Sequence, residues 1–281
     1  MSFSTELKEE LSKTENLSNK EAVKYELLGY LISSNISKEK NKTKFSTENE
    51  YNINRFSRLL SNMGINTYDI AIQGKLFVIT VKTQELETIQ YAEDLNAEQI
   101  RWMIKGAYLG AGSINNPENK YHLEISVSQE KEAQKIIEYL KSFDIKSNCI
   151  EKNNQYAIYI KDGEEISKFL ALLGANKSVL RFEEIRVQRE MNNKINRIVN
   201  CETANLNKTI NASIEQIEAI RKLKESNNFE KLDEPLKEIA DLRVQNPNAS
   251  LIELGKMLKK PVGKSGVNYR LKKTMEIANG E

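Results

Sequence analysis

One pattern of hydrophobic and polar positions occurs twice in the first two-thirds of the chain. At an offset of 80 residues, which places Phe45 on Ile125, apolar positions coincide without a gap. Each copy reads as a strand, a helix, a strand, a tight turn and a strand, with turns at 73–75 and 153–155. This register predicts an internal duplication. The aligned apolar pairs are Phe56 with Ile136, Leu60 with Leu140, Met63 with Phe143, Ile65 with Ile145, Ile70 with Ile150 and Val78 with Ile158.

A helical segment rich in small residues precedes each copy. Gly29 and Ser33 lie four residues apart in the first segment, and Gly106 and Gly110 lie four apart in the second. A glycine inside a helix costs roughly 1 kcal/mol relative to alanine, so several on one face suggest that two backbones approach closely. We therefore expect the two helices to pack together at a pseudo-twofold axis, each with its own small sheet. An ordinary pair of core helices would not need the glycines.

Helical patterns dominate the rest of the chain. An exposed, mixed-charge helix is predicted from Leu180 to about Asn200, followed by a polar loop at 201–209 that leads to the next helix. A solvated linker helix is favoured over a second phosphate-binding surface, because glutamates dilute the basic residues. The sequence thus predicts a duplicated domain at 1–179, with halves near 18–85 and 95–175. A linker helix and loop at 180–212 and a helical domain at 213–281 follow.

Four helix starts are predicted in the helical domain. Ser213 with Gln216 and Ser250 with Glu253 have the capping-box spacing, and Pro235 favours a third start. The fourth helix is predicted to begin with Ser265 as its N-cap. Its inward residues are predicted to be Val267, Leu271, Thr274, Met275 and Ala278, and its outward residues Ser265, Tyr269 and Lys272, flanked by Asn268 and Lys273.

The last two helices and the segment between them predict a helix-turn-helix. The first helix, from Leu251 to Leu258, has one apolar face on which Gly255 would let a second helix cross closely. Pro261 and Gly263 end this helix and form a turn. The turn is longer than the roughly three or four residues of the tightest examples.

The local charge of this motif differs from that of the whole chain. The 281 residues carry a net charge of only +2, whereas Lys259–Lys273 contains six basic residues and no acidic one. In a helix-turn-helix the second helix enters the major groove of DNA, and lysines around it contact phosphates. A solvated basic face on an ordinary helical hairpin is the alternative. The candidate DNA-binding residues are Lys259, Lys260, Lys264, Ser265, Gly266, Asn268, Tyr269, Arg270, Lys272 and Lys273.

Residue types argue against most enzyme chemistry. The chain has one histidine, His122, no glycine-rich phosphate loop and no Cys/His cluster, so no metal or cofactor is predicted. Cys149 and Cys201 are isolated thiols, which is typical of a reducing cytoplasm. No apolar run approaches the ~20 residues that span a membrane. The first predicted helix, Thr5–Lys13, is too charged for a signal peptide.

The segment Gly106-Ala-Tyr-Leu-Gly-Ala-Gly-Ser-Ile resembles the signature helix of LAGLIDADG homing endonucleases. Those enzymes place a metal-binding carboxylate immediately before the final glycine of each signature. The corresponding residues here are Ala111 in the second copy and Ser34 in the first, where Asn35 replaces the glycine. Neither can hold Mg²⁺ as the nuclease requires. The resemblance therefore implies that the architecture is retained without the cleavage chemistry, in a protein that is not an enzyme.

A degenerate LAGLIDADG unit followed by a helix-turn-helix resembles the WhiA family of bacterial sporulation and cell-division regulators. The resemblance rests on AYLGAGSINNPENKYHLEI, NRIVNCETANLNKT, EPLKEIADLR, NPNASLIELGKML and KSGVNYRLKK, which occur in that order. It implies an α+β fold, in which a duplicated αββαββα pseudo-dimer precedes an all-α helix-turn-helix domain. It also implies a sequence-specific transcriptional regulator linked to sporulation, or to cell division and chromosome segregation. Its partner would be double-stranded promoter DNA in the cytoplasm, at the nucleoid, with RNA polymerase or another transcription factor as a further candidate.

Two other functions remain open from the residues. In a residual endonuclease another carboxylate would replace the missing pair, and Glu26 and Glu118 lie near the signature helices but not at the required positions. In a protein-interaction scaffold the duplicated domain would bind a transcription or division protein, and DNA binding would be secondary. The two predicted sheets carry scattered lysines that could still meet phosphate. These are Lys42, Lys44, Lys75, Lys152 and Lys161.

Overall fold

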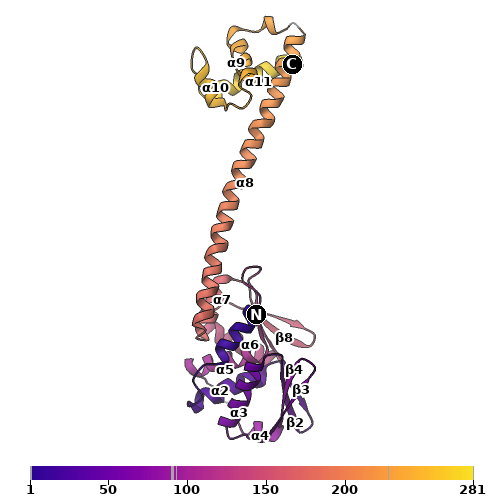
Figure 1. Cartoon of the computed structure of the whole chain (residues 1–281), viewed down its shortest axis with the longest axis vertical. Helices are drawn as coiled ribbons and strands as arrows, with labels where there is room; N and C mark the ends of the chain where they lie inside the picture. The colour runs from indigo at the N-terminus through magenta and orange to yellow at the C-terminus, as the bar shows by residue number, and fades with distance from the viewer. Residues whose placement is uncertain (1, 90–91, 93, 227, 281) are drawn as a thin grey trace. The chain divides into compact units, whose positions relative to one another are not determined.

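The computed structural model describes residues 2–89, 92, 94–226 and 228–280. It divides the chain into two compact units, Met1–Glu190 and Met191–Glu281, here called the N-terminal and C-terminal units (Figure 1). No helix among the described residues is both long and apolar enough to cross a membrane.

The N-terminal unit contains one arrangement of helices and strands twice, after a short first helix, α1 (Phe3–Ser12). The first copy consists of α2 (Lys20–Ile32), β1 (Ile36–Glu39), β2 (Lys42–Thr47), α3 (Glu50–Asn62), β3 (Tyr68–Gln73), β4 (Leu76–Lys82) and α4 (Thr83–Glu87). The second consists of α5 (Ala97–Ala111), β5 (Gly112–Ile114), β6 (Leu123–Val127), α6 (Glu130–Ser142), β7 (Asn148–Lys152), β8 (Gln155–Ile160) and α7 (Gly163–Leu172). The duplicated αββαββα pattern is therefore confirmed. The short strands β1 and β5 were not evident from hydrophobic alternation.

The two antiparallel sheets have the same strand order, β1-β2-β4-β3 and β5-β6-β8-β7. Their registers correct one part of the gapless alignment. Phe45 lies opposite Ile79 and Ile125 lies opposite Ile158, so Ile158 corresponds to Ile79, and the predicted match with Val78 is wrong. Equivalent positions in β7 and β8 therefore follow α6 one residue sooner along the chain than those in β3 and β4 follow α3. A one-residue slip moves a side chain to the other face of a sheet, so Ile70 and Ile150 are not equivalent either.

Helices α2 and α5 pack against each other at the positions of their glycines. A Cβ atom added at Gly106 would lie 1.9 Å from the backbone oxygen of Glu26, and one at Gly29 would lie 2.1 Å from that of Met103. At Gly110 an added Cβ would lie 2.4 Å from Ser33 Oγ. Two backbones therefore meet where only glycine fits, as the small-residue pattern predicted.

A buried ion cluster lies beside this helix contact. Arg55 donates through Nε and Nη2 to the two carboxylate oxygens of Glu26, each at 2.8 Å, and Lys105 Nζ lies 3.3 Å from the same carboxylate. Burial would raise the pKa of Glu26, but the hydrogen bonds from Arg55 and the charge of Lys105 hold that pKa below its usual value. Burial lowers the pKa of Lys105 to about 8.

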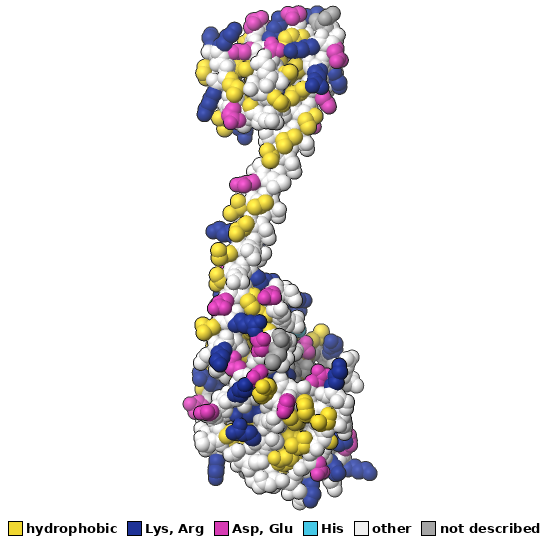
Figure 2. Space-filling model, viewed as in Figure 1, with side chains coloured by type: hydrophobic (Ala, Val, Ile, Leu, Met, Phe, Trp, Pro, Cys, Tyr) yellow, Lys and Arg dark blue, Asp and Glu magenta, His cyan; other side chains and the backbone are white. Residues whose placement is uncertain are grey.

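Helix α8 (Asn176–Glu225) corrects the predicted linker, because it runs without interruption through the expected loop at 201–209. The segment has many asparagines but no proline or glycine, so nothing in it breaks a helix. Ser213 does not begin a new helix: it is buried within α8, and its hydroxyl donates to the carbonyl of Pro247 at 2.6 Å. Every residue from 191 to 212 is exposed, and Figure 2 shows hydrophobic side chains along this length.

The C-terminal unit is helical. After α8 come a 3-10 turn (Phe229–Lys231), α9 (Glu234–Gln245), α10 (Leu251–Met257) and α11 (Lys264–Asn279). The last three helices share a small core, which consists of Ile239, Leu254, Leu258, Val267 and Leu271. A second cluster joins the end of α8 to α9, through Leu223, Leu232 and Leu236, with Ala278 of α11 packed against it.

Candidate nucleic-acid interface

Helix α10 begins at the predicted capping box. Ser250 N donates to Glu253 Oε2 at 2.8 Å, and Glu253 N donates to Ser250 Oγ at 3.3 Å. The bond that Ser250 N donates to the carboxylate is the main cause that lowers the pKa of Glu253, and the Ser250 side chain adds to it. The reciprocal bonds fix where the first helix of the motif starts.

The turn between α10 and α11 is held by hydrogen bonds that two of its backbone N–H groups donate. Lys259 N donates to Glu238 Oε1 at 2.6 Å, and Val262 N donates to the carbonyl of Gly255 at 3.2 Å. A Cβ atom at Gly255 would lie 2.2 Å from the oxygen of Val262 and 3.2 Å from Val267 Cγ2. The glycine therefore admits the backbone of the turn, whereas the sequence predicted that a second helix would make the closest approach.

Helix α11 begins at Lys264, and its N-cap is Gly263, which has no side chain to cap the helix. The prediction that Ser265 is the N-cap is therefore wrong, because Ser265 lies inside the first turn. The backbone N–H of Val267 bonds to the carbonyl of Gly263. The preceding N–H groups, those of residues 264 to 266, precede the first intrahelical bond and have no capping side chain. Such groups, together with the helix dipole, attract phosphate.

The two faces of α11 follow the predicted pattern. Val267, Leu271 and Thr274 are fully buried, and Thr274 Oγ1 donates to the carbonyl of Arg270 at 2.9 Å. Tyr269 is 66% exposed, although it is a large aromatic residue. Among the other candidates Lys259, Lys260, Lys264, Ser265, Asn268 and Lys272 are exposed, whereas Gly266, Arg270 and Lys273 are half-buried.

The positive charge around α11 is largely uncompensated. Lys272 lies 3.9 Å from Glu276, and both side chains are largely exposed, so this pair contributes little. The other basic candidates have no ion pair within the described part of the chain; these are Lys259, Lys260, Lys264, Arg270 and Lys273. The structure thus brings the candidates together on the turn and on α11, while their role as DNA contacts stays a prediction.

Arg243 supports this motif and was not identified as a structural residue from the sequence. It is buried in α9, and its Nη1 donates to the carbonyl of Ala249 at 2.7 Å and to that of Pro247 at 3.4 Å. Burial lowers the pKa of its guanidinium group. The side chain therefore fixes the loop that leads into α10. One signal in the sequence could have indicated this role: Arg243 occupies a position at which the helical repeat of α9 would place an apolar residue.

The ends of α2 and α5 adjoin at Ser34 and Ala111, the positions at which the sequence resemblance to LAGLIDADG signatures would place carboxylates. Asn35 Nδ2 donates to the carbonyl of Gly110 at 2.8 Å, so Ser34 and Ala111 lie at adjoining helix ends. Neither side chain is a carboxylate. The carboxylate of Glu26 is paired within the ion cluster, and that of Glu118 is exposed and accepts one hydrogen bond from Asn116 Nδ2. No group of three or more His, Cys, Asp or Glu residues in the described ranges is arranged to hold a metal ion.

The lysines on the two sheets are dispersed. Lys44 pairs with Glu39 at 2.7 Å, and Lys161 lies 4.4 Å from the ring centroid of Tyr159. Lys42, Lys75 and Lys152 are exposed on separate strands or turns. They form no cluster comparable to that of α11.

Comparisons with known proteins match both units. Two family models match the chain, the WhiA LAGLIDADG-like domain at residues 100–192 and the WhiA C-terminal HTH domain at residues 195–278. The chain is 36% identical to the probable cell division protein WhiA of Clostridium tetani, over 99% of this chain and 97% of the relative. It is 42% identical to the protein of the same name from Clostridium acetobutylicum, over 75% of this chain and 69% of the relative.

Solved structures also match. The crystal structure of full-length WhiA from Thermatoga maritima matches with a TM-score of 0.63 and 29% identity, over 100% of this chain and 99% of that one. A crystal structure of the N-terminal LAGLIDADG domain of WhiA matches with a TM-score of 0.55 and 25% identity. This match covers 60% of this chain and 88% of the other.

Proposed function

The chain belongs to the WhiA family, and from that premise we propose that it is a non-catalytic, sequence-specific regulator of transcription that binds promoter DNA. The helix-turn-helix of the C-terminal unit would supply the DNA contacts. Residues 213–281 would act as the DNA-binding region and residues 1–179 as an accessory domain, with 180–212 connecting them through α8.

The biological role that we propose is in cell division. Relatives with 36% and 42% identity carry the name probable cell division protein. Chromosome segregation and sporulation belong to the same proposal as further processes. We place the protein at the nucleoid in the cytoplasm, with RNA polymerase or another transcription factor as a second partner. These assignments rest on the family.

The start of α11 is the observation that carries the proposal for DNA binding. Uncapped N–H groups lie there beside Lys264, and the basic residues of the turn and of α11, apart from Lys272, lack acidic partners among the described residues. A helix N-terminus of this kind binds a phosphate oxygen, while residues one and two turns further reach base edges. Ser34 and Ala111 support the absence of nuclease chemistry.

The proposal is tested by measuring DNA affinity against salt for the full chain, on promoter fragments and on random duplex. A triple variant, Lys259→Ala, Lys260→Ala and Lys264→Ala, should bind more weakly and with a shallower salt dependence, by about 0.9 in slope for each phosphate that the protein no longer neutralises. The matched control removes the same charge from the sheets, through Lys42→Ala, Lys75→Ala and Lys152→Ala. If the control loses binding instead, the sheets are the recognition surface. If the full chain binds neither the promoter fragments nor random duplex, the scaffold function is favoured.

Lys264→Ala alone should weaken binding by a similar factor on every DNA sequence. Lys264 is exposed at the first residue of α11, where its ammonium can reach a phosphate but carries no sequence information. Titrations at several salt concentrations should show a slope lower by about one phosphate. An unchanged slope would remove Lys264 from the interface.

Asn268→Ala and Arg270→Ala should instead reduce the preference for the correct site. Both residues lie in the first two turns of α11, and their side chains have the donor geometry for purine edges. We expect a loss of about 1–3 kcal/mol on the preferred promoter for each base contact, and a smaller loss on random DNA. Competition between the two duplexes measures the difference. Equal losses on both would assign these residues to phosphate.

A further inference from the structure

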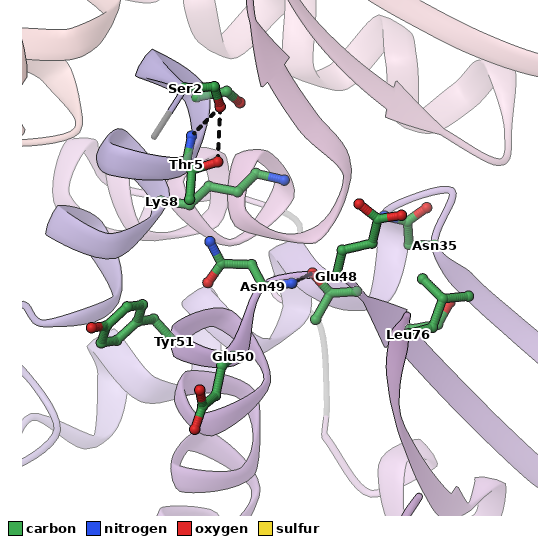
Figure 3. Close-up of a pocket in the computed structure, with 12 residues that line it drawn as sticks. Ser2, Thr5, Lys8, Asn35, Glu48, Asn49, Glu50, Tyr51 and Leu76 are labelled. Carbon is green, nitrogen blue, oxygen red and sulfur yellow. Dashed lines mark hydrogen bonds between the residues drawn. The ribbon is translucent and has the colours of Figure 1, made fainter. Parts of the chain in front are cut away.

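A cavity of about 660 Å³ opens in the N-terminal unit, between α1 and the turn that joins β2 to α3. Its walls include Ser46 and Thr47 at the end of β2, Asn49 in that turn, and Asn35, which follows α2. Figure 3 shows Lys8 extending from α1 into this space. The volume is in the usual range for small-molecule sites, about 300–1,000 Å³. All of its lining residues belong to the N-terminal unit, and the function proposed above assigns the cavity no role.

Lys8 is the unusual residue of this cavity. It is half-buried, and no hydrogen bond or ion pair occupies its ammonium group within the described part of the chain. Burial lowers the pKa of Lys8 to about 8, so the group is still mainly charged at pH 7. The ammonium group thus faces the cavity with no acidic neighbour bound to it, and it is available to an anion that enters the cavity.

Neighbouring groups can complete an anion site. Asn49 Oδ1 accepts from Asn52 N at 3.0 Å as the N-cap of α3, and its Nδ2 has no partner among the described residues. Asn35 Nδ2 donates to the carbonyl of Gly110, and the side-chain oxygen Oδ1 of Asn35 has no partner in the described part of the chain. The cavity therefore offers a cation, an amide donor and an amide acceptor.

Two carboxylates near the cavity define what else the ligand carries. Figure 3 shows Glu48 extending toward Asn35, on the side of the cavity that Lys8 faces, whereas Glu50 points away. Lys8 and Glu48 form no ion pair with each other. A ligand with an anionic group for Lys8 and a hydroxyl or ammonium donor for Glu48 would satisfy both. A DNA duplex fits less well, because its successive phosphates would be repelled by Glu48 and Glu50.

We propose that this cavity binds a small polar metabolite through Lys8, with a carboxylate or phosphate group on the ammonium and a hydroxyl or ammonium donor on Glu48. Asn49 would donate a second hydrogen bond to the anion, and Asn35 would accept one from the ligand.

The proposal is tested on the full chain by NMR, with ¹³C at the lysine Cε atoms. The Lys8 resonance is the one missing from the Lys8→Gln variant. Inorganic phosphate, glycerol 3-phosphate and succinate are titrated in turn, with sodium chloride at matched ionic strength as the blank. We expect a saturable shift of Lys8 with at least one probe and none with chloride. The difference between the phosphates and succinate identifies the anionic group, and stronger binding of glycerol 3-phosphate than of phosphate supports the contact with Glu48.

Variants on the same helix provide the control. Because the variants at position 8 have no Lys8 resonance, the affinity of each variant for the tightest-binding probe is measured by isothermal titration calorimetry. Lys8→Gln should weaken binding about tenfold or more, as expected for loss of a charge-assisted hydrogen bond. Lys13→Gln should bind like the wild type, because Lys13 is paired with Glu9 at 2.6 Å. Lys8→Arg keeps the cation and should retain binding, so it stands in if Lys8→Gln does not fold. No saturable shift with any probe, or equal losses in Lys8→Gln and Lys13→Gln, would overturn the proposal. It would also fall if only a DNA duplex shifted Lys8.

Discussion

Arg55→Ala should lower the unfolding free energy of the N-terminal unit by about 3–5 kcal/mol, the cost of breaking a buried ion pair by removing one partner. Arg55 and Glu26 are both fully buried and share two hydrogen bonds of 2.8 Å. Without Arg55, the carboxylate would keep Lys105 at 3.3 Å and a hydrogen bond from Asn16 Nδ2 at 3.2 Å, and burial already lowers the pKa of Lys105 to about 8. The variant would leave a charge in the core without the two hydrogen bonds from its main partner.

Denaturation by urea, followed through tryptophan fluorescence, measures this loss. Trp102 is the single tryptophan of the chain and lies in α5, so it reports on the N-terminal unit alone. Lys44→Ala is the matched control, because it removes a lysine from an ion pair of 2.7 Å with Glu39 on the surface. Its expected loss is below about 1 kcal/mol. A loss that small in Arg55→Ala would mean that Glu26 becomes protonated or hydrated at little cost.

Gly106→Ala should destabilise the same unit by about 3 kcal/mol or more, at the upper end of the usual cost of overpacking. The sign is opposite to that expected for an exposed helix, where alanine is favoured over glycine by roughly 1 kcal/mol. The new Cβ atom would lie 1.9 Å from the carbonyl oxygen of Glu26 and 3.1 Å from the Cα of Gly29. Both neighbours are backbone atoms, so no change of rotamer relieves the clash and α2 must move away from α5.

The same fluorescence measurement applies, with Gly74→Asn as the control. Gly74 has a φ of 63° and open space around the position of a Cβ atom. Asparagine tolerates this conformation, as Asn153 and Asn154 do in the corresponding turn at φ values of 53° and 58°. The control should therefore stay close to the wild type. A stabilised Gly106→Ala variant would show that the two helices are not held at this distance.

Features that depend on short-range geometry were predictable from the sequence. The spacing of Ser250 and Glu253 defines a capping box whose hydrogen bonds need only one turn of helix, and the bonds form. The glycines at 29 and 106 predicted the contact between α2 and α5, because few causes other than a close approach of backbones favour glycine inside a helix. Hydrophobic periodicity likewise placed Val267 and Leu271 inward on α11.

Other features depend on alternatives that the local sequence cannot rank. Ser213 and Gln216 have the same spacing as the true capping box, but the residues before Ser213 are helical. Their carbonyl groups accept from the backbone N–H groups of this turn, so no cap is needed. The hydroxyl of Ser213 binds Pro247, which lies 34 positions away. The one-residue shift between β3 and β7 arises from a difference of one residue in the connection that precedes each strand. The apolar positions of the two copies match similarly well with or without this shift, so the sequence alone did not reveal it. Lys8 was missed because its cavity joins segments distant in sequence.

Ser34 and Ala111 lie outside the contact that holds α2 and α5 together. Both residues lie where the signature helices finish, past the crossing at which Gly29 and Gly106 admit no side chain. A substitution at the helix ends changes what the site can ligate but leaves the crossing intact, whereas a substitution at the crossing would disrupt the scaffold. The ligating groups of this site and the stability of the domain can therefore be varied independently in this chain.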